Sequence, residues 1–148
     1  MAETLGSLCD KLTVVKLKQW HAEEADKLRS LAEQEKQLQE EIGEYLDAAV
    51  RGDIPLKRLT FDANKIYKSE GNFVGEIIGN IGEVFSLLVN INCALWHEQE
   101  KVYDFEKVPV KEKNNVVKNL ANLNLERNKC IDQINSQLRI MIENKYRQ

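Results

Sequence analysis

Two short motifs in this sequence combine a histidine with a carboxylate at a spacing suited to chemistry. His21 precedes Glu24, and His97 precedes Glu100, so that each motif reads His-x-x-Glu. Residues three positions apart on a helix lie on the same face, so the imidazole and the carboxylate can reach one point. Two such helices facing each other would offer two nitrogen and two oxygen ligands. That set suits a divalent transition metal such as Zn²⁺, Mn²⁺ or Fe²⁺.

A structural role for the same residues is the simpler interpretation. Trp20 and Trp96 immediately precede the two histidines and would serve as core anchors. Each histidine would then hydrogen-bond to a neighbouring carboxylate or carbonyl, because buried polar groups are normally satisfied in this way. The additional glutamates that di-iron bundles place on their other helices are not identifiable here. We favour the structural interpretation and keep the metal site as its alternative.

A second candidate site lies in a predicted C-terminal helix over about residues 110–145. Residues three and four apart predict one buried stripe along it, interrupted by Asn124 and Arg127. A buried arginine is costly unless it is paired, so either a carboxylate meets Arg127 or this stretch lines a polar cleft. In such a cleft, Arg127 and Asn124 would fix an anionic or sugar ligand. The stripe comprises Val117, Leu120, Asn124, Arg127, Ile131, Ile134, Leu138 and Met141.

The two histidine motifs belong to a longer internal match, which we interpret as duplication of a helical unit. The chain's only two tryptophans and only two histidines fall in register when the sequence is shifted by 76 positions. An offset of 92 aligns residues farther along and sets Glu35 against Arg127, which could form an internal ion pair. Two equal units commonly pack about a pseudo-two-fold axis. Matched pairs include Leu5 with Ile81, Trp20-His21 with Trp96-His97, Glu24 with Glu100, Ile42 with Ile134 and Leu46 with Leu138.

The composition predicts an all-α fold, a four- to five-helix bundle of the two duplicated units. Only 7 glycines and 2 prolines occur in 148 residues, so the turns of a multi-stranded β protein are missing. We expect a single domain with a first unit at 1–52, a connector at 53–71 and a second unit at 72–148. A helix is expected at 62–68, and a longer one from residue 72 to about 105. Gly71, Gly75 and Gly79 would share a face there. Residues 5–50 are either one helix or two with a turn near Asp26.

Charge and cysteine usage exclude several classes of protein. A net charge of −3 and scattered basic residues argue against a nucleic-acid partner. Cys9, Cys93 and Cys130 are too far apart for a zinc knuckle or a disulfide framework and predict reduced, buried thiols in a cytoplasmic protein. The N-terminus lacks the pattern of a signal peptide, and the longest apolar stretch, residues 84–95, is too short to span a bilayer.

Two segments of the second half resemble a bacterial family of unknown function. Residues 92–101 read Asn-Cys-Ala-Leu-Trp-His-Glu-Gln-Glu-Lys, and residues 122–132 read Asn-Leu-Asn-Leu-Glu-Arg-Asn-Lys-Cys-Ile-Asp. The family carries Asn-x-x-Leu-Trp-His-x-Glu-Asp and then Leu-Asn-x-x-Arg-Asn. This chain departs from the first motif at Gln99-Glu100, where the family has Glu-Asp. The resemblance makes the most interesting residues Trp96, His97, Asn124, Arg127 and Asn128.

The beginning of the chain is similar to a second uncharacterised helical family, through the run Asp10-Lys11-Leu12-Thr13. Some members of that family are encoded among genes for cell-surface polysaccharide assembly. The leading hypothesis is a non-enzymatic helical interaction protein, because bundle-type periodicity is abundant and the sequence contains no specific catalytic constellation. It would associate with itself or another protein, as an accessory to envelope polysaccharide synthesis. The alternative is a metal- or small-molecule-binding bundle built on the paired His-x-x-Glu motifs, and no catalytic residue is assigned.

Overall fold

The computed structural model describes residues 3–61 and 75–147, and over these residues the regular structure is entirely helical. The predicted all-α fold is therefore confirmed. No helix in the described part of the chain is long and apolar enough to cross a membrane. The helices are α1 (Leu5–His21), α2 (Ala25–Arg51), α3 (Leu56–Leu59), α4 (Ile81–Tyr103) and α5 (Val110–Tyr146), with a 3-10 turn at Phe105–Lys107.

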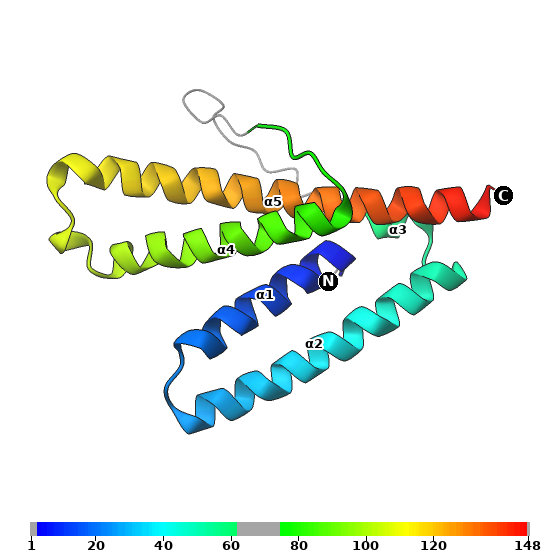
Figure 1. Ribbon diagram of the computed structural model, residues 1–148, viewed down its shortest axis with the longest axis horizontal. Helices are drawn as coiled ribbons and strands as arrows, with labels where there is room; N and C mark the ends of the chain where they lie inside the picture. The colour runs from blue at the N-terminus through cyan, green and yellow to red at the C-terminus, as the bar shows by residue number, and fades with distance from the viewer. Residues whose placement is uncertain (1–2, 62–74, 148) are drawn as a thin grey trace.

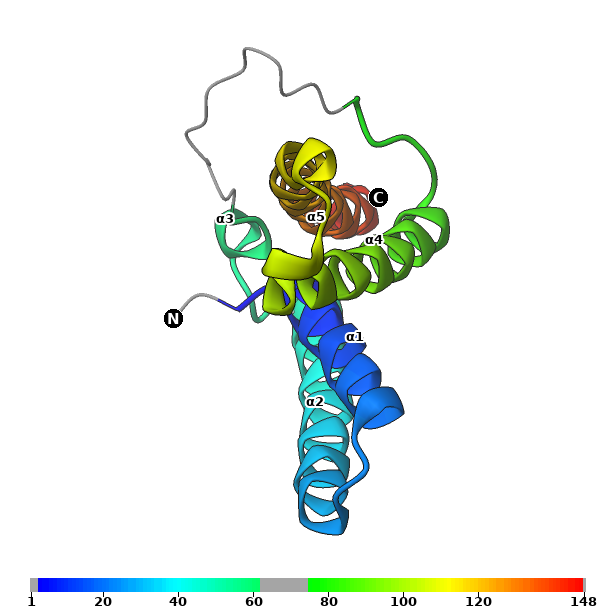
Figure 2. The same cartoon turned by 90° about the vertical axis from the view of Figure 1, so that its left-hand side faces the viewer.

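The long helices form two antiparallel hairpins, α1 with α2 and α4 with α5 (Figure 1). Figure 2 shows the α1–α2 hairpin projecting away from the α4–α5 pair. α1 packs against both α4 and α5, whereas α2 packs mainly against α1. At its C-terminal end α2 also meets α5, where the Val50 carbonyl accepts a hydrogen bond of 2.8 Å from the Tyr146 hydroxyl. α1 thus makes the main contact between the two hairpins.

The first fifty residues form two helices, because the chain is extended between His21 and Ala25. Ala22 has φ −79° and ψ 140°, and its N–H closes the last turn of α1 by donating to the Lys18 carbonyl. Asp26, which could have capped α2, lies one residue inside it, where its charge favours the positive end of the helix dipole. α2 ends at Gly52 in the left-handed conformation that glycine adopts most easily.

α4 begins at Ile81, so the prediction that this helix starts near residue 72 is wrong. The Asn80 side chain accepts a hydrogen bond of 2.9 Å from the Glu83 N–H, and the Glu83 carboxylate accepts one from the Asn80 N–H. This capping box fixes the start of the helix. Gly79 has a φ of 136°, and Gly75 also precedes the helix, so neither belongs to a helical face. Gly71 and the helix predicted at 62–68 lie outside the described residues.

The predicted stripe of α5 is correct in its middle and wrong at both ends. Ile134 and Leu138 are buried, but Val117 is 58% and Met141 is 47% exposed. The buried residues at the ends are Val116 and Ile142 instead. The predicted 3-4 alternation assumes 3.5 residues per turn, whereas a straight helix has 3.6. The buried positions therefore drift away from a strict seven-residue repeat toward the two ends of the helix. The shared core comprises Leu5, Ala49, Leu59, Val84, Leu88, Ile91, Cys130, Ile134, Leu138 and Ile142.

The three cysteines are free thiols, and the prediction that they are buried is correct only for Cys130. Cys130 is buried, and Cys9 and Cys93 are half-buried. Burial, with a smaller contribution from Asp10, raises the pKa of Cys9 to about 11. Burial, with a smaller contribution from Glu126, raises the pKa of Cys130 to about 11. Both thiols therefore remain protonated at neutral pH and behave as small apolar side chains.

The α1–α2 hairpin carries a pH-sensitive contact. Glu35 accepts hydrogen bonds of 2.8 Å from the Lys16 amine and from the Gln19 amide of α1. The Lys16 bond and then the Gln19 bond lower the pKa of Glu35 below its ordinary value of 4.5. A carboxyl whose pKa is lower in the folded state adds stability above its unfolded pKa, and this stability is lost as the pH falls through the folded value.

We expect Glu35→Gln to unfold at a lower urea concentration than the parent at pH 7, because the charged partner of Lys16 is gone. In acid, below the lowered pKa of Glu35, the two midpoints should converge, since the parent carboxyl is then protonated. Glu40→Gln, a change at an exposed position of the same helix, is the control and should leave the midpoint unchanged at either pH. If the urea midpoint of Glu35→Gln stays equally far below that of the parent in acid, this assignment is contradicted.

Candidate functional site

A carboxylate does meet Arg127, and it comes from α1. The Arg127 Nε donates to Asp10 Oδ1 at 2.8 Å, and its Nη2 donates to Asp10 Oδ2 at 2.5 Å. The Asn92 amide of α4 donates to the same Asp10 Oδ1 at 3.0 Å. Asp10 is 6% exposed and Asn92 is 3% exposed. The two-pronged geometry is the strong form of an arginine–carboxylate pair, and here it joins α1, α4 and α5.

The expected ion pair between Arg127 and Glu35 is wrong. Glu35 lies on the α1–α2 hairpin and binds Lys16, whereas Arg127 is engaged by Asp10. Hydrogen bonding to Asp10 outweighs desolvation and raises the pKa of Arg127 above its ordinary value, so the guanidinium stays charged. Glu35 and Arg127 therefore each pair with a different residue of α1.

His21, the last residue of α1, is stacked on Trp96 of α4. The ring centroids are 4.5 Å apart and the planes are inclined by 18°. The His21 Nδ1 lies 2.9 Å from the Leu17 carbonyl oxygen, and its Nε2 lies 4.0 Å from Glu100 Oε1. His21 of the first motif therefore lies against Glu100 of the second motif and against Trp96, which precedes that motif. This contact attaches the end of α1 to α4.

The structural interpretation predicts that Trp20 and Trp96 are both core anchors, and for Trp20 this prediction is wrong. Trp20 is 85% exposed, whereas Trp96 is half-buried beneath His21. At the end of α1 it is the imidazole, not the preceding indole, that faces α4. Adjacent residues on a helix point in directions about 100° apart, so only one of the pair can occupy that position.

The four side chains of the His-x-x-Glu motifs do not form one cluster. His21 approaches Glu100, but Glu24 pairs with Lys27 at 3.5 Å within the first turn of α2. His97 is exposed. Across residues 3–61 and 75–147, no three His, Cys, Asp or Glu side chains are grouped so that they could hold a metal ion. The geometry therefore unites one histidine and one glutamate from different motifs rather than four metal ligands.

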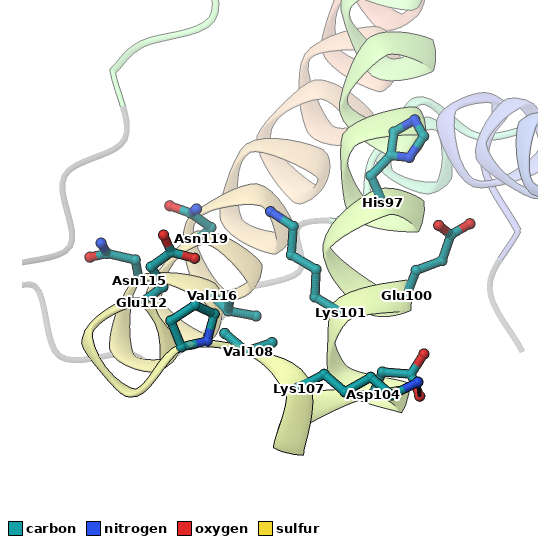
Figure 3. Close-up of a pocket in the computed structure, with 11 residues that line it drawn as sticks. His97, Glu100, Lys101, Asp104, Lys107, Val108, Glu112, Asn115, Val116 and Asn119 are labelled. Carbon is teal, nitrogen blue, oxygen red and sulfur yellow. Dashed lines mark ion pairs between the residues drawn. The ribbon is translucent and has the colours of Figure 1, made fainter.

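His97 lines an open cleft of about 780 Å³ at the end of the α4–α5 hairpin. Figure 3 shows His97 and Glu100 on the α4 side of the cleft, and Glu112 and Asn119 on the α5 side. Lysines and carboxylates are mixed along its walls, and Lys101 is already paired with Glu98 at 2.9 Å. The cleft thus presents charges of both signs. Its lining residues are His97, Glu100, Lys101, Asp104, Lys107, Val108, Pro109, Glu112, Asn115, Val116 and Asn119.

Three of the four predicted ligand-binding residues line one smaller cavity, of about 200 Å³, between α1, α4 and α5. These are Trp96, Asn124 and Arg127; Asn128, which is half-buried on α5, does not line it. Asp10 is not among the predicted site residues. The only signal that pointed to it was the requirement that some carboxylate satisfy Arg127. We call this space the Trp96 cavity. It is lined by Val14, Leu17, Asn92, Leu95, Trp96, Gln99, Leu120, Asn124 and Arg127.

The resemblance of residues 92–132 to a bacterial family of unknown function stays a prediction. Comparison of the chain with protein-family models, with curated proteins and with solved structures finds no match.

Proposed function

We propose that this chain is a non-enzymatic helical interaction protein that works as an assembly of identical copies. The observation that carries the proposal is the exposure of large apolar side chains on the segments where α1 and α4 end and α5 begins. Exposed apolar side chains that lie together mark sites of interaction with another protein.

The segments where α1 and α4 end and α5 begins lie toward one end of the molecule (Figure 1), and they carry exposed large apolar side chains. Trp20 is 85%, Tyr103 80%, Val110 85% and Val117 58% exposed. We call these four residues the distal patch. Tryptophan and tyrosine are the side chains that most often anchor an interface, because they bury a large area at a small cost in conformational entropy. A second copy of this chain is the proposed occupant, since a self-complementary patch closes a symmetric dimer.

Trp20→Ser combined with Tyr103→Ser is expected to weaken self-association at least about 10-fold, because each anchor contributes about 2 kcal/mol or more to a typical interface. Size-exclusion chromatography with light scattering measures the mass. The matched control is Ile78→Ser with Ile140→Ser, which removes apolar side chains that are 83% and 54% exposed outside the patch. The control should assemble like the parent. An equal decrease of the measured molar mass in both double variants would contradict the proposal that the distal patch forms the interface.

The two hairpins also support the proposed duplication. α1 begins at Leu5 and α4 at Ile81, the offset of 76 seen in the sequence. Both helices start with a capping box, Thr4 with Ser7 in α1 and Asn80 with Glu83 in α4, at positions that differ by the same offset. Helix starts are defined by local sequence, so a shared start favours a common origin of the two units.

An accessory role in envelope polysaccharide synthesis is proposed from the resemblance alone. In a cell that lacks the gene, the parent chain should restore the amount of surface polysaccharide. The Trp20→Ser, Tyr103→Ser variant should restore less of it than the Ile78→Ser, Ile140→Ser control does. Unchanged polysaccharide in the cell without the gene would contradict the role and would leave the proposed assembly untouched.

A further inference from the structure

The Trp96 cavity has the construction of a small-molecule site. Val14 and Leu17 of α1, Leu95 of α4 and Leu120 of α5 supply apolar walls. Polar side chains enter from two of the same three helices, as Asn92 and Gln99 of α4, and Asn124 and Arg127 of α5. Ligand pockets are mostly apolar and carry a few convergent polar groups, and they commonly form between the helices of a bundle.

The polar groups of the cavity are mainly carboxamides, which both donate and accept hydrogen bonds. Within the described part of the chain, the side-chain amides of Gln99 and Asn124 make no hydrogen bond to another residue. Asn92 is oriented by the bond from its Nδ2 to Asp10. Three amides facing a space of about 200 Å³ therefore present donors and acceptors together to whatever occupies it.

The electrostatics of the cavity favour a neutral ligand. Arg127 is the one charged side chain among its lining residues in the described chain. Two of its nitrogens already bind the buried Asp10 carboxylate, at 2.8 Å and 2.5 Å. An anion would have to displace Asp10 or approach it closely, and a buried carboxylate left unpaired is costly. The pair also leaves the cavity with no net charge to attract a cation.

The aromatic side chain that lines the cavity has a stacking partner. Trp96 is stacked on His21, which is itself bonded to the Leu17 carbonyl and lies beside Glu100. An indole fixed in this way offers a flat apolar surface without losing side-chain entropy on binding, and such preorganisation strengthens binding. A ring-shaped ligand uses a surface of this shape best.

We propose that the Trp96 cavity binds a neutral, single-ring compound that carries both hydrogen-bond donors and acceptors. Pockets for drug-sized molecules start at about 300 Å³, and the Trp96 cavity is smaller, at about 200 Å³. A compound with a single ring is therefore the size that the cavity can hold. A monosaccharide and a free nucleobase share this chemistry and are the two sources to distinguish. The site does not depend on self-association.

The test is titration of the full chain with N-acetylglucosamine, glucose and adenine, followed by nuclear magnetic resonance of the two indole N–H signals. Trp20→Phe assigns the signals, since Trp20 is 85% exposed and does not line the cavity. At least one neutral compound should shift the Trp96 signal saturably, with Kd about 1 mM for a ligand of this size. The Trp20 signal should stay in place. The compound that binds identifies the source.

Two variants locate the binding. Asn124→Leu and Gln99→Leu should each weaken it at least about 10-fold, because each removes an amide from the cavity. Asn119→Leu is the matched control on α5, since Asn119 lines the His97 cleft instead, and it should bind like the parent. Glucose 6-phosphate should bind less tightly than glucose. The proposal is overturned if no neutral compound moves the Trp96 signal, if the phosphate binds more tightly, or if Asn119→Leu weakens binding equally.

Discussion

Gly6→Ala is expected to destabilise the protein by about 2–4 kcal/mol, because α1 crosses α5 too closely at this position for a side chain. A Cβ there would lie 2.5 Å from the Ile131 carbonyl oxygen and 2.9 Å from Asn135 Oδ1. The first obstacle is backbone within a helix and cannot move alone. Separating the helices would also lengthen the 2.7 Å hydrogen bond from the Gly6 N–H to Asn135.

That hydrogen bond matters because of where Gly6 lies in α1. The first N–H groups of a helix have no partner within it, and the Gly6 N–H is one of them. Asn135, which is 1% exposed, supplies the acceptor from α5. The crossing thus satisfies a donor that would otherwise be buried without a partner.

Gly43→Ala is the matched control for Gly6→Ala. Gly43 lies inside α2, and a Cβ there would meet nothing within 4 Å. Alanine is the better helix former, so this change should stabilise the protein by about 0.5–1 kcal/mol. Urea unfolding followed by circular dichroism compares both variants with the parent. A loss below about 1 kcal/mol for Gly6→Ala would show that α1 and α5 are not packed this closely.

Arg127→Ala is expected to cost about 3 kcal/mol of unfolding free energy, because it leaves the buried Asp10 carboxylate without its partner. About a third of the Arg127 side chain is exposed, so the loss should lie at the lower end of the range for fully buried pairs. Asp10→Ala should also destabilise the protein. In the double variant no unpaired charge remains, and its loss should be smaller than the sum of the two single losses.

Arg139→Ala is the control for Arg127→Ala on the same helix. Arg139 pairs with Glu143 four residues later at 2.8 Å, on the surface of α5. Exposed pairs of this kind contribute about 0.3–0.5 kcal/mol. Additive losses for Asp10→Ala and Arg127→Ala in the double-mutant cycle would contradict a direct pair between them.

The helical elements could be predicted well where local sequence decides them. α5 was expected at about 110–145 and spans Val110–Tyr146. Gly52, Pro109 and the uninterrupted helix formers of α2 and α5 carry that information. The predicted start of α4 near residue 72 is wrong because Gly79 takes a φ of 136°, which a right-handed helix excludes. The sequence pattern of Asn80 with Glu83 marked the true start.

The candidate site could be predicted only in part, because its partners come from distant segments. The sequence predicts that Arg127 needs a carboxylate, but Asp10 lies 117 residues away. In the sequence Asp10 occupies an ordinary polar position of an amphipathic helix. Likewise, nothing in the dipeptide Trp20-His21 reveals that the imidazole faces α4 while the indole faces solvent. Such choices depend on how the helices cross, which one sequence does not specify.

Sedimentation equilibrium of the parent chain, from about 1 μM to about 100 μM, tests the central claim that this protein functions as an assembly of identical copies. We expect a mass that rises with concentration from 17.1 kDa to twice that value. The Trp20→Ser, Tyr103→Ser variant should require a concentration at least about 10-fold higher to reach the same mass. A parent that remains at 17.1 kDa throughout this range would contradict the account.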